Sequence, residues 1–260
     1  MQEIINLRVF AAICPAISGL WFILWLINAN SREKLFLGSI YAGEVSELRR
    51  LFQEIKARGY KIIGPKLLDG VIRLAELHNF EDIPYRVGDV QKPGYYRVKA
   101  DGGRFRSPMD SPKRILYPPE LLLFKVKNGI EVEYPSYEFP KTAFFGIKPC
   151  DLAAIMIMDR VQGELGDEYF LKMRKNLMIV VENCIEPGEN CFCATMGTGP
   201  AATGGFDIAY TRLDDSLVLF QAGSDMGVDV LGELNLEPAS PDQIDRLRDC
   251  LLYTSPSPRD

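Results

Sequence analysis

The stretch between residues 142 and 184 limits the fold more than any other part of the chain, because it reads as strand, helix and strand. Residues 144–147 form a short apolar run, and residues 177–184, LMIVVENC, are apolar enough for a strand buried on both faces. Helical sequence separates the two runs: Asp151 is the expected N-cap of a first helix, and residues 167–176 form a second. A crossover of this length favours parallel pairing of the strands. We therefore expect a parallel βαβ element.

The residues before this element predict a mixed α+β region with irregular connections. Residues 44–60 place apolar side chains at helical spacing and charged side chains on the other face. Residues 60–65 and 70–77 read as short strands around a turn. Residues 79–118 are rich in turn-forming residues and contain one expected strand at 95–100. The fold class is therefore α/β (mixed α+β), with the short parallel βαβ element preceded by an irregular α+β module.

Both ends of the chain differ in character from the middle, which predicts three parts. The N-terminal segment, residues 1–33, includes the apolar run 9–28, which is long enough to span a bilayer. A membrane anchor, a leader translated from a wrong start codon and a buried helix are equally compatible with that run. Residues 34–250 form the expected folded module. Residues 251–260, LLYTSPSPRD, change abruptly in composition and are interpreted as a non-native tail.

Four cysteines lie where the predicted fold would bring them together. The carboxyl ends of parallel strands meet at one edge of a sheet, and Cys150 and Cys184 each follow one of the two expected strands. Cys191 and Cys193 come soon afterwards, in a loop where a turn at residues 187–188 reverses the chain. We therefore expect these four thiols at one edge of the sheet, as candidate ligands of one metal group.

Four thiolates suit either a zinc ion or an iron-sulfur cluster. Zinc sites usually use C-x-x-C pairs, in which both sulfurs reach one small ion. In this chain a single residue separates Cys191 from Cys193, and this spacing favours the separated corners of a cluster. A zinc-stabilised structural or interaction module is the alternative.

The residues around the thiols suggest how they are tuned. Cys150 lies at the start of a helix, where the dipole is expected to favour its thiolate. Phe145, Phe192 and Met196 are candidates for an apolar shell that excludes water from the cluster. Residues 194–205 are rich in glycine, which lets backbone amides approach sulfur. This stretch lacks the lysine and the third glycine of phosphate-binding loops.

Composition and charge argue against several classes of function. The net charge of -5 leaves no basic surplus for nucleic acid. His78 is the sole histidine, which excludes His-rich zinc sites and hydrolases that depend on a Ser-His or Cys-His pair. The six cysteines are too few and too clustered for a disulfide-rich secreted scaffold, so a reducing, cytoplasmic setting is expected.

Taken together, these motifs resemble a known family. FFGIKPCDLAAIMIMDRV, NCIEPGENCFCATMGTGP and the shorter stretches YKIIGPKLLDGVI, DVQKPGYYRV, SPKRILYPPELLLF and GFDIAYT are similar to the iron-sulfur beta subunits of cytoplasmic hydrogenases and sulfhydrogenases. They also resemble the related A subunit of anaerobic sulfite reductase. The resemblance covers most of residues 45–232, and the combination of motifs is more specific than any one of them.

The resemblance implies an electron-transfer subunit rather than a catalytic one. It implies a 4Fe-4S cluster on Cys150, Cys184, Cys191 and Cys193, within an iron-sulfur module at 34–250. It also implies a flavin-containing NAD(P)H subunit and a hydrogenase or sulfite reductase catalytic subunit as partners, and a cytoplasmic location. The family continues into two ferredoxin-type cysteine runs, which are absent from this sequence, so a truncated C-terminus is expected.

Overall fold

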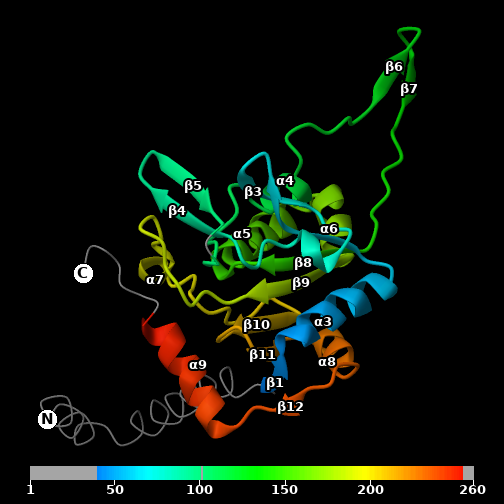
Figure 1. Ribbon diagram of the computed structural model, residues 1–260. Coiled ribbons are helices and arrows are strands. Elements are labelled where there is room, and N and C mark those ends of the chain that lie inside the picture. The colour runs from blue at the N-terminus through cyan, green and yellow to red at the C-terminus, as the bar shows by residue number, and fades with distance from the viewer. Residues whose placement is uncertain (1–39, 101, 254–260) are drawn as a thin grey trace, which may run out of the picture. The chain divides into compact units, whose positions relative to one another are not determined.

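The computed structural model describes residues 40–100 and 102–253 (Figure 1). The apolar run 9–28 and residues 254–260 of the expected tail lie outside the described residues. Among the helices that are described, none is long and apolar enough to cross a membrane.

An eight-stranded mixed sheet organises the described residues, with strand order β12-β1-β11-β10-β9-β8-β2-β3. The four central strands β10, β9, β8 and β2 are parallel to one another, and the outer pairings are antiparallel. The strands are β1 (Ile40–Glu44), β2 (Lys61–Leu68), β3 (Val71–Glu76), β8 (Thr142–Ile147), β9 (Leu177–Glu182), β10 (Ile208–Arg212), β11 (Leu217–Ala222) and β12 (Glu237–Pro238).

Helices cover both faces of this sheet, so each face has its own apolar core (Figure 1). The helices are α3 (Val45–Ala57), α4 (Lys113–Leu116), α5 (Pro149–Leu165), α6 (Glu168–Lys175), α7 (Cys193–Met196), α8 (Asp225–Leu231) and α9 (Pro241–Tyr253), with a 3-10 turn at Phe80–Asp82. Helices α3 and α8 pack on one face, and α4, α5 and α6 pack on the other. Helix α9 packs on β1 and β11 through Leu247 and Leu251, and it continues past residue 250.

The predicted βαβ element is confirmed. Strands β8 and β9 pair in parallel, with Thr142 opposite Leu177, and α5 and α6 form the crossover. Every residue of both strands is buried, because helices cover both faces of the sheet. The α+β region expected before this element belongs to the same fold: β2 and β3 extend the sheet, and α3 packs on one of its faces. Residues 79–141 hold most of the irregular structure.

A β-bulge at the end of β8 turns the chain toward the cysteines. Gly146 has φ of 74°, and the register shifts between Phe145 and Ile147. A Cβ at Gly146 would lie 3.0 Å from the hydroxyl oxygen of Tyr210, so both space and backbone conformation favour glycine. After the bulge, Lys148 enters the interior, where only 4% of its surface is exposed.

The prediction that Asp151 caps α5 is wrong. Lys148 is the N-cap residue, with no side-chain cap, and Pro149 occupies the first helical position. Proline is favoured at that position because its fixed φ suits the helix and its missing N–H is not needed there. The helix therefore begins earlier than expected, and Cys150 lies within its first turn.

Two separate hairpins stand outside the main sheet: β4 (Gly88–Lys92) with β5 (Tyr95–Lys99), and β6 (Lys125–Lys127) with β7 (Glu131–Glu133). The second is an arm that projects away from the main sheet (Figure 1). On one of its faces Val126 and Val132 are paired, and both side chains are more than half exposed.

We expect this arm to contribute little to stability, because its side chains are open to solvent. Replacing residues 123–134 with a short glycine-serine linker should change the free energy of unfolding by no more than about 0.5 kcal/mol. Urea denaturation of the two proteins measures this difference. A loss of several kcal/mol would show that the arm packs on the body in solution.

Candidate metal centre

The site is built around three charged side chains at the carboxyl ends of neighbouring parallel strands. Lys148 directly follows β8, Glu182 ends β9 and Arg212 ends β10. The Lys148 Nζ donates to Glu182 Oε2 at 2.9 Å, and the Arg212 Nε donates to Glu182 Oε1 at 2.7 Å. All three residues are buried, so two positive charges face one negative charge in the interior. We refer to Lys148, Glu182 and Arg212 as the charge triad.

The triad keeps Glu182 ionised. Burial alone would raise the pKa of Glu182, but the charges of Arg212 and Lys148 outweigh burial and lower it to about 2. Each cation also lies against an aromatic ring. The Lys148 Nζ is 4.6 Å from the centre of the Phe105 ring, and the Arg212 guanidinium carbon is 4.5 Å from that of Tyr85.

Two of the predicted cysteines follow the triad directly. Cys150 and Cys184 each come two residues after a triad member, Lys148 and Glu182 respectively. The ion pair between those members therefore fixes the starts of both cysteine-bearing segments relative to one another. The backbone N–H of Cys184 also donates to the carbonyl oxygen of Pro200 at 3.1 Å, which ties this segment to the glycine-rich loop.

The other two predicted cysteines lie in the loop after β9 and approach the same region. The N–H of Gly188 donates to Cys191 Sγ at 3.1 Å. A Cβ at Gly199 would lie 3.1 Å from Cys193 Sγ and 3.5 Å from the Cβ of Pro149. Gly199 therefore lies in close contact with both Cys193 and the start of α5.

The four thiols are close enough to affect each other's ionisation. Cys184 and Cys193 both raise the pKa of Cys150, and Cys193 and Cys191 both raise that of Cys184. The structure thus brings all four predicted ligands into one region. Within the described residues, however, no group of three or more histidine, cysteine, aspartate or glutamate side chains is arranged to hold a metal ion. The fifth described cysteine, Cys250, lies on α9 in an apolar cluster with β1 and β11 that also includes Ala201 of the glycine-rich loop.

The expectation that the start of α5 favours the Cys150 thiolate is not supported. Cys150 as a whole residue is exposed, yet burial of its thiol and the neighbouring Asp151 raise the thiol pKa to about 12. Burial likewise raises the pKa of Cys184 to about 12, although Lys148 acts in the opposite direction. Desolvation therefore outweighs the opposing effects of the Asp151 backbone at Cys150 and of Lys148 at Cys184, which favours the protonated form of both thiols in the metal-free protein.

This gives a test on the metal-free protein. The thiolate is the species that reacts with iodoacetamide, so at pH 8 Cys150 and Cys184 should be alkylated about a thousandfold more slowly than in the urea-unfolded chain. Peptide mass spectrometry over time measures the rate at each cysteine. Rates within tenfold of the unfolded chain would contradict the raised pKa values.

The predicted apolar shell is wrong in its details. Phe145 packs in the core beneath α3, with its ring centre 5.7 Å from that of Phe52. Alternate residues of a strand face opposite sides, so Phe145 is directed away from the face that carries α5. Phe192 and Met196 are 67% and 63% exposed, and therefore do not enclose the thiols.

The sequence reasoning missed Glu182 and Arg212 as parts of the site, and it also missed residues 104–107, Arg-Phe-Arg-Ser. A charged residue at the end of a fully apolar strand is a signal that could have identified Glu182. Residues 104–107 carry no comparable signal, because their importance depends on contacts with distant segments.

One buried donor beside the thiols has no acceptor. The Nε of Arg106 is buried and makes no hydrogen bond among the described residues. We refer to residues 184–193, which follow β9, as the cysteine loop. An unsatisfied buried N–H is costly, and next to the cysteine loop it fits a site that receives a negatively charged, sulfur-rich group. The four thiols, the surplus positive charge of the triad and this donor are together compatible with a thiolate-bound cluster.

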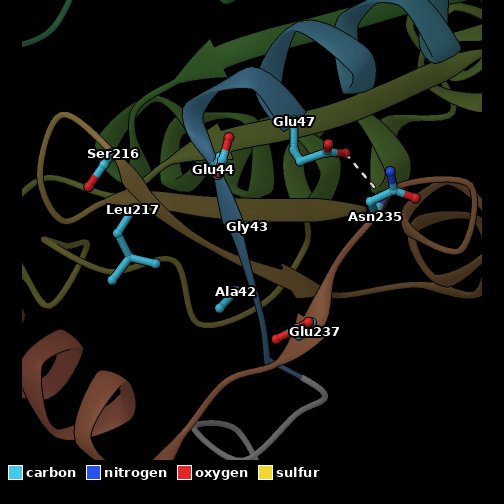
Figure 2. A pocket seen from close by; sticks show the side chains of 8 residues that line it. All are labelled: Ala42, Gly43, Glu44, Glu47, Ser216, Leu217, Asn235 and Glu237. Carbon is cyan, nitrogen blue, oxygen red and sulfur yellow. Dashed lines mark hydrogen bonds between the residues drawn. The ribbon is translucent and has the colours of Figure 1, made fainter.

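Two of the hollows on the described surface differ in their position relative to the thiols. The larger of the two, of about 620 Å³, lies beside β1, and Figure 2 shows Glu47 accepting the backbone N–H of Asn235 there at 3.1 Å. Its lining includes three glutamates and no cysteine, so it is separate from the thiols. The smaller, of about 210 Å³, is lined by α5 and the glycine-rich loop and includes Pro149, next to Cys150.

Comparison with known proteins agrees with the motifs. No family model matches the chain. The chain is 34% identical over 123 residues to sulfhydrogenase 2 subunit beta from Pyrococcus furiosus. That match covers 47% of this chain and 35% of the relative, so the chain spans about a third of that protein's length. The comparison confirms that this chain resembles the beta subunits of hydrogenases and sulfhydrogenases.

Proposed function

We propose that the protein is an electron-transfer subunit of a hydrogenase-type complex and binds one 4Fe-4S cluster through Cys150, Cys184, Cys191 and Cys193. The observation that carries the proposal is the convergence of these thiols from separate chain segments beside the buried charge triad. When bound, such a cluster takes up and releases one electron at a time.

The residues of this chain would hold and tune the cluster. The charge triad fixes the ends of β8 and β9, so that Cys150 and Cys184 are held at a defined separation. The two cations of the triad would stabilise bound thiolates, among them those of Cys150 and Cys184, whose pKa values burial raises in the metal-free protein. Binding would therefore release protons from Cys150 and Cys184.

We further propose that the protein works between a flavin-containing NAD(P)H subunit and a catalytic subunit, either a hydrogenase or a sulfite reductase. The name of the relative, a sulfhydrogenase subunit, supports an assembly of several chains. The exposed side chains of Phe192 and Met196 leave the cysteine loop accessible to such a partner. We place the protein in the cytoplasm, because a reducing compartment keeps these thiols available.

Elemental analysis tests the proposal. Protein purified without oxygen should contain about four iron and four sulfide per chain. One zinc per chain without sulfide would overturn the cluster and favour the alternative, a zinc-stabilised structural or interaction module.

A further inference from the structure

Residues 104–107 contact three parts of the site: the charge triad, the first turn of α5 and the loop that carries Cys184 and Cys191. Each of the four residues makes its own contact. The contacts are Arg104 Nη1 to the Arg212 carbonyl oxygen (2.6 Å), the Phe105 ring to Lys148 Nζ (4.6 Å), Arg106 Nη2 to the Pro187 carbonyl oxygen (3.3 Å) and Ser107 Oγ to Asp151 Oδ2 (3.3 Å). This short segment therefore links the charge triad, the first turn of α5 and the cysteine loop.

Arg106 is the most tightly held of the four. Its backbone N–H donates to Asp89 Oδ1 at 2.9 Å, and Asp89 is only 4% exposed. Its Nη1 donates to the carbonyl oxygens of Asp89 and Arg104, at 3.1 and 2.8 Å. With Nη2 on Pro187, these bonds fix the guanidinium and leave Nε as its buried nitrogen without an acceptor among the described residues.

The unpaired Nε and Cys191 Sγ both lie close to Gly188. A Cβ at Gly188 would lie 3.7 Å from Arg106 Nε and 3.6 Å from Cys191 Sγ. It would also lie 3.2 Å from Arg106 Cγ, which is tighter than ordinary van der Waals contact. The glycine therefore allows Arg106 to approach the cysteine loop closely, and its own N–H already donates to Cys191 Sγ.

We propose that Arg106 donates its Nε–H to the sulfur atoms at the Cys191 corner of the bound cluster and raises the cluster's midpoint potential. This inference rests on the proposed function. The guanidinium of Arg106 lies 3.7 Å from Asp89 Oδ1 and 3.9 Å from Glu186 Oε2, so its charge is largely balanced and the Nε–H is the group that acts on the cluster. The reduced cluster carries one more negative charge than the oxidised cluster, so a fixed N–H that donates to sulfur stabilises the reduced form. The rigid guanidinium provides this donor without reorganising when the electron arrives.

The test is a redox titration of the anaerobic, cluster-loaded protein and its variants. Arg106→Met removes both the charge and the donor, and its midpoint potential should be more negative than that of the wild type. Arg106→Lys keeps the charge but not the Nε donor, so its potential should shift in the same direction by less. Arg73→Met is the matched control, because Arg73 is exposed on edge strand β3, and its potential should equal the wild-type value.

An unchanged potential in Arg106→Met would overturn the inference while leaving the cluster in place. If the methionine variant fails to fold, Arg106→Lys decides, and a wild-type potential in that variant counts equally against the inference. A wild-type protein that binds no cluster would instead overturn the proposed function itself. The two failures are therefore distinguished by the cluster content of the wild type.

Discussion

Replacing Glu182 with glutamine is expected to lower the free energy of unfolding by about 3 to 5 kcal/mol. The substitution keeps the size of the side chain but leaves Lys148 and Arg212 buried with no negative charge between them. Removing one partner of a buried ion pair costs more than the pair contributes, because the remaining charges stay desolvated. Urea denaturation at pH 7 measures the loss.

Glu189→Gln is the matched control for this prediction. Glu189 pairs with Lys92 on the surface, where both side chains are at least half exposed, so its loss should cost less than about 1 kcal/mol. Equal effects of the two substitutions would contradict a buried charge triad.

The difference between wild type and Glu182→Gln should also depend on pH. Because the folded-state pKa of Glu182 is lowered from 4.5 to about 2, its contribution is fully present above about pH 4.5. The contribution is lost as the pH falls toward 2, where the wild-type carboxylate also becomes neutral. The stability difference should therefore shrink over this range, and a constant difference would show that Glu182 is not held as an anion.

Replacing Cys184 with serine is expected to abolish stable cluster binding. Cys184 is one of the four proposed ligands, and its position is set by the N–H bond to the Pro200 carbonyl and by the triad residue Glu182 two positions before it. After anaerobic reconstitution and gel filtration, the iron content should fall from about four per chain to less than about one.

Cys250→Ser provides the control for the loss of a thiol as such. Cys250 packs in the apolar cluster of α9 and is not one of the four proposed ligands, so this variant should keep the wild-type iron content. Wild-type iron content in Cys184→Ser, or an equal loss in Cys250→Ser, would contradict the assignment of the four ligands.

The sheet was predictable where local pattern and burial agree. Strands β8 and β9 come from two apolar runs that are separated by helical sequence, and they pair in parallel as predicted. Few strand arrangements with a crossover of this length bury both faces of both strands. The start of α5 was predicted less well. Asp151 is a good N-cap residue in isolation, but Pro149 fits the first helical position better, and the structure places the boundary there.

The sequence predicted that the four proposed ligands lie in one region, but it did not predict what surrounds them. Strand order alone places Cys150 and Cys184 at one sheet edge. In contrast, Arg106 reaches the cysteine loop across more than 80 positions of sequence, and Arg104 contacts Arg212 across 108. Such contacts depend on how the β4–β5 region folds back, which no short pattern encodes. The bulge at Gly146, which turns Lys148 toward Glu182, was missed for the same reason.

Electron paramagnetic resonance of the anaerobically reconstituted protein tests the central claim most directly. If the four thiols hold a 4Fe-4S cluster, the oxidised protein should be brown, and dithionite should add one electron and produce the signal of a reduced, paramagnetic cluster. A colourless preparation that stays silent after dithionite would contradict the cluster and the electron-transfer role together.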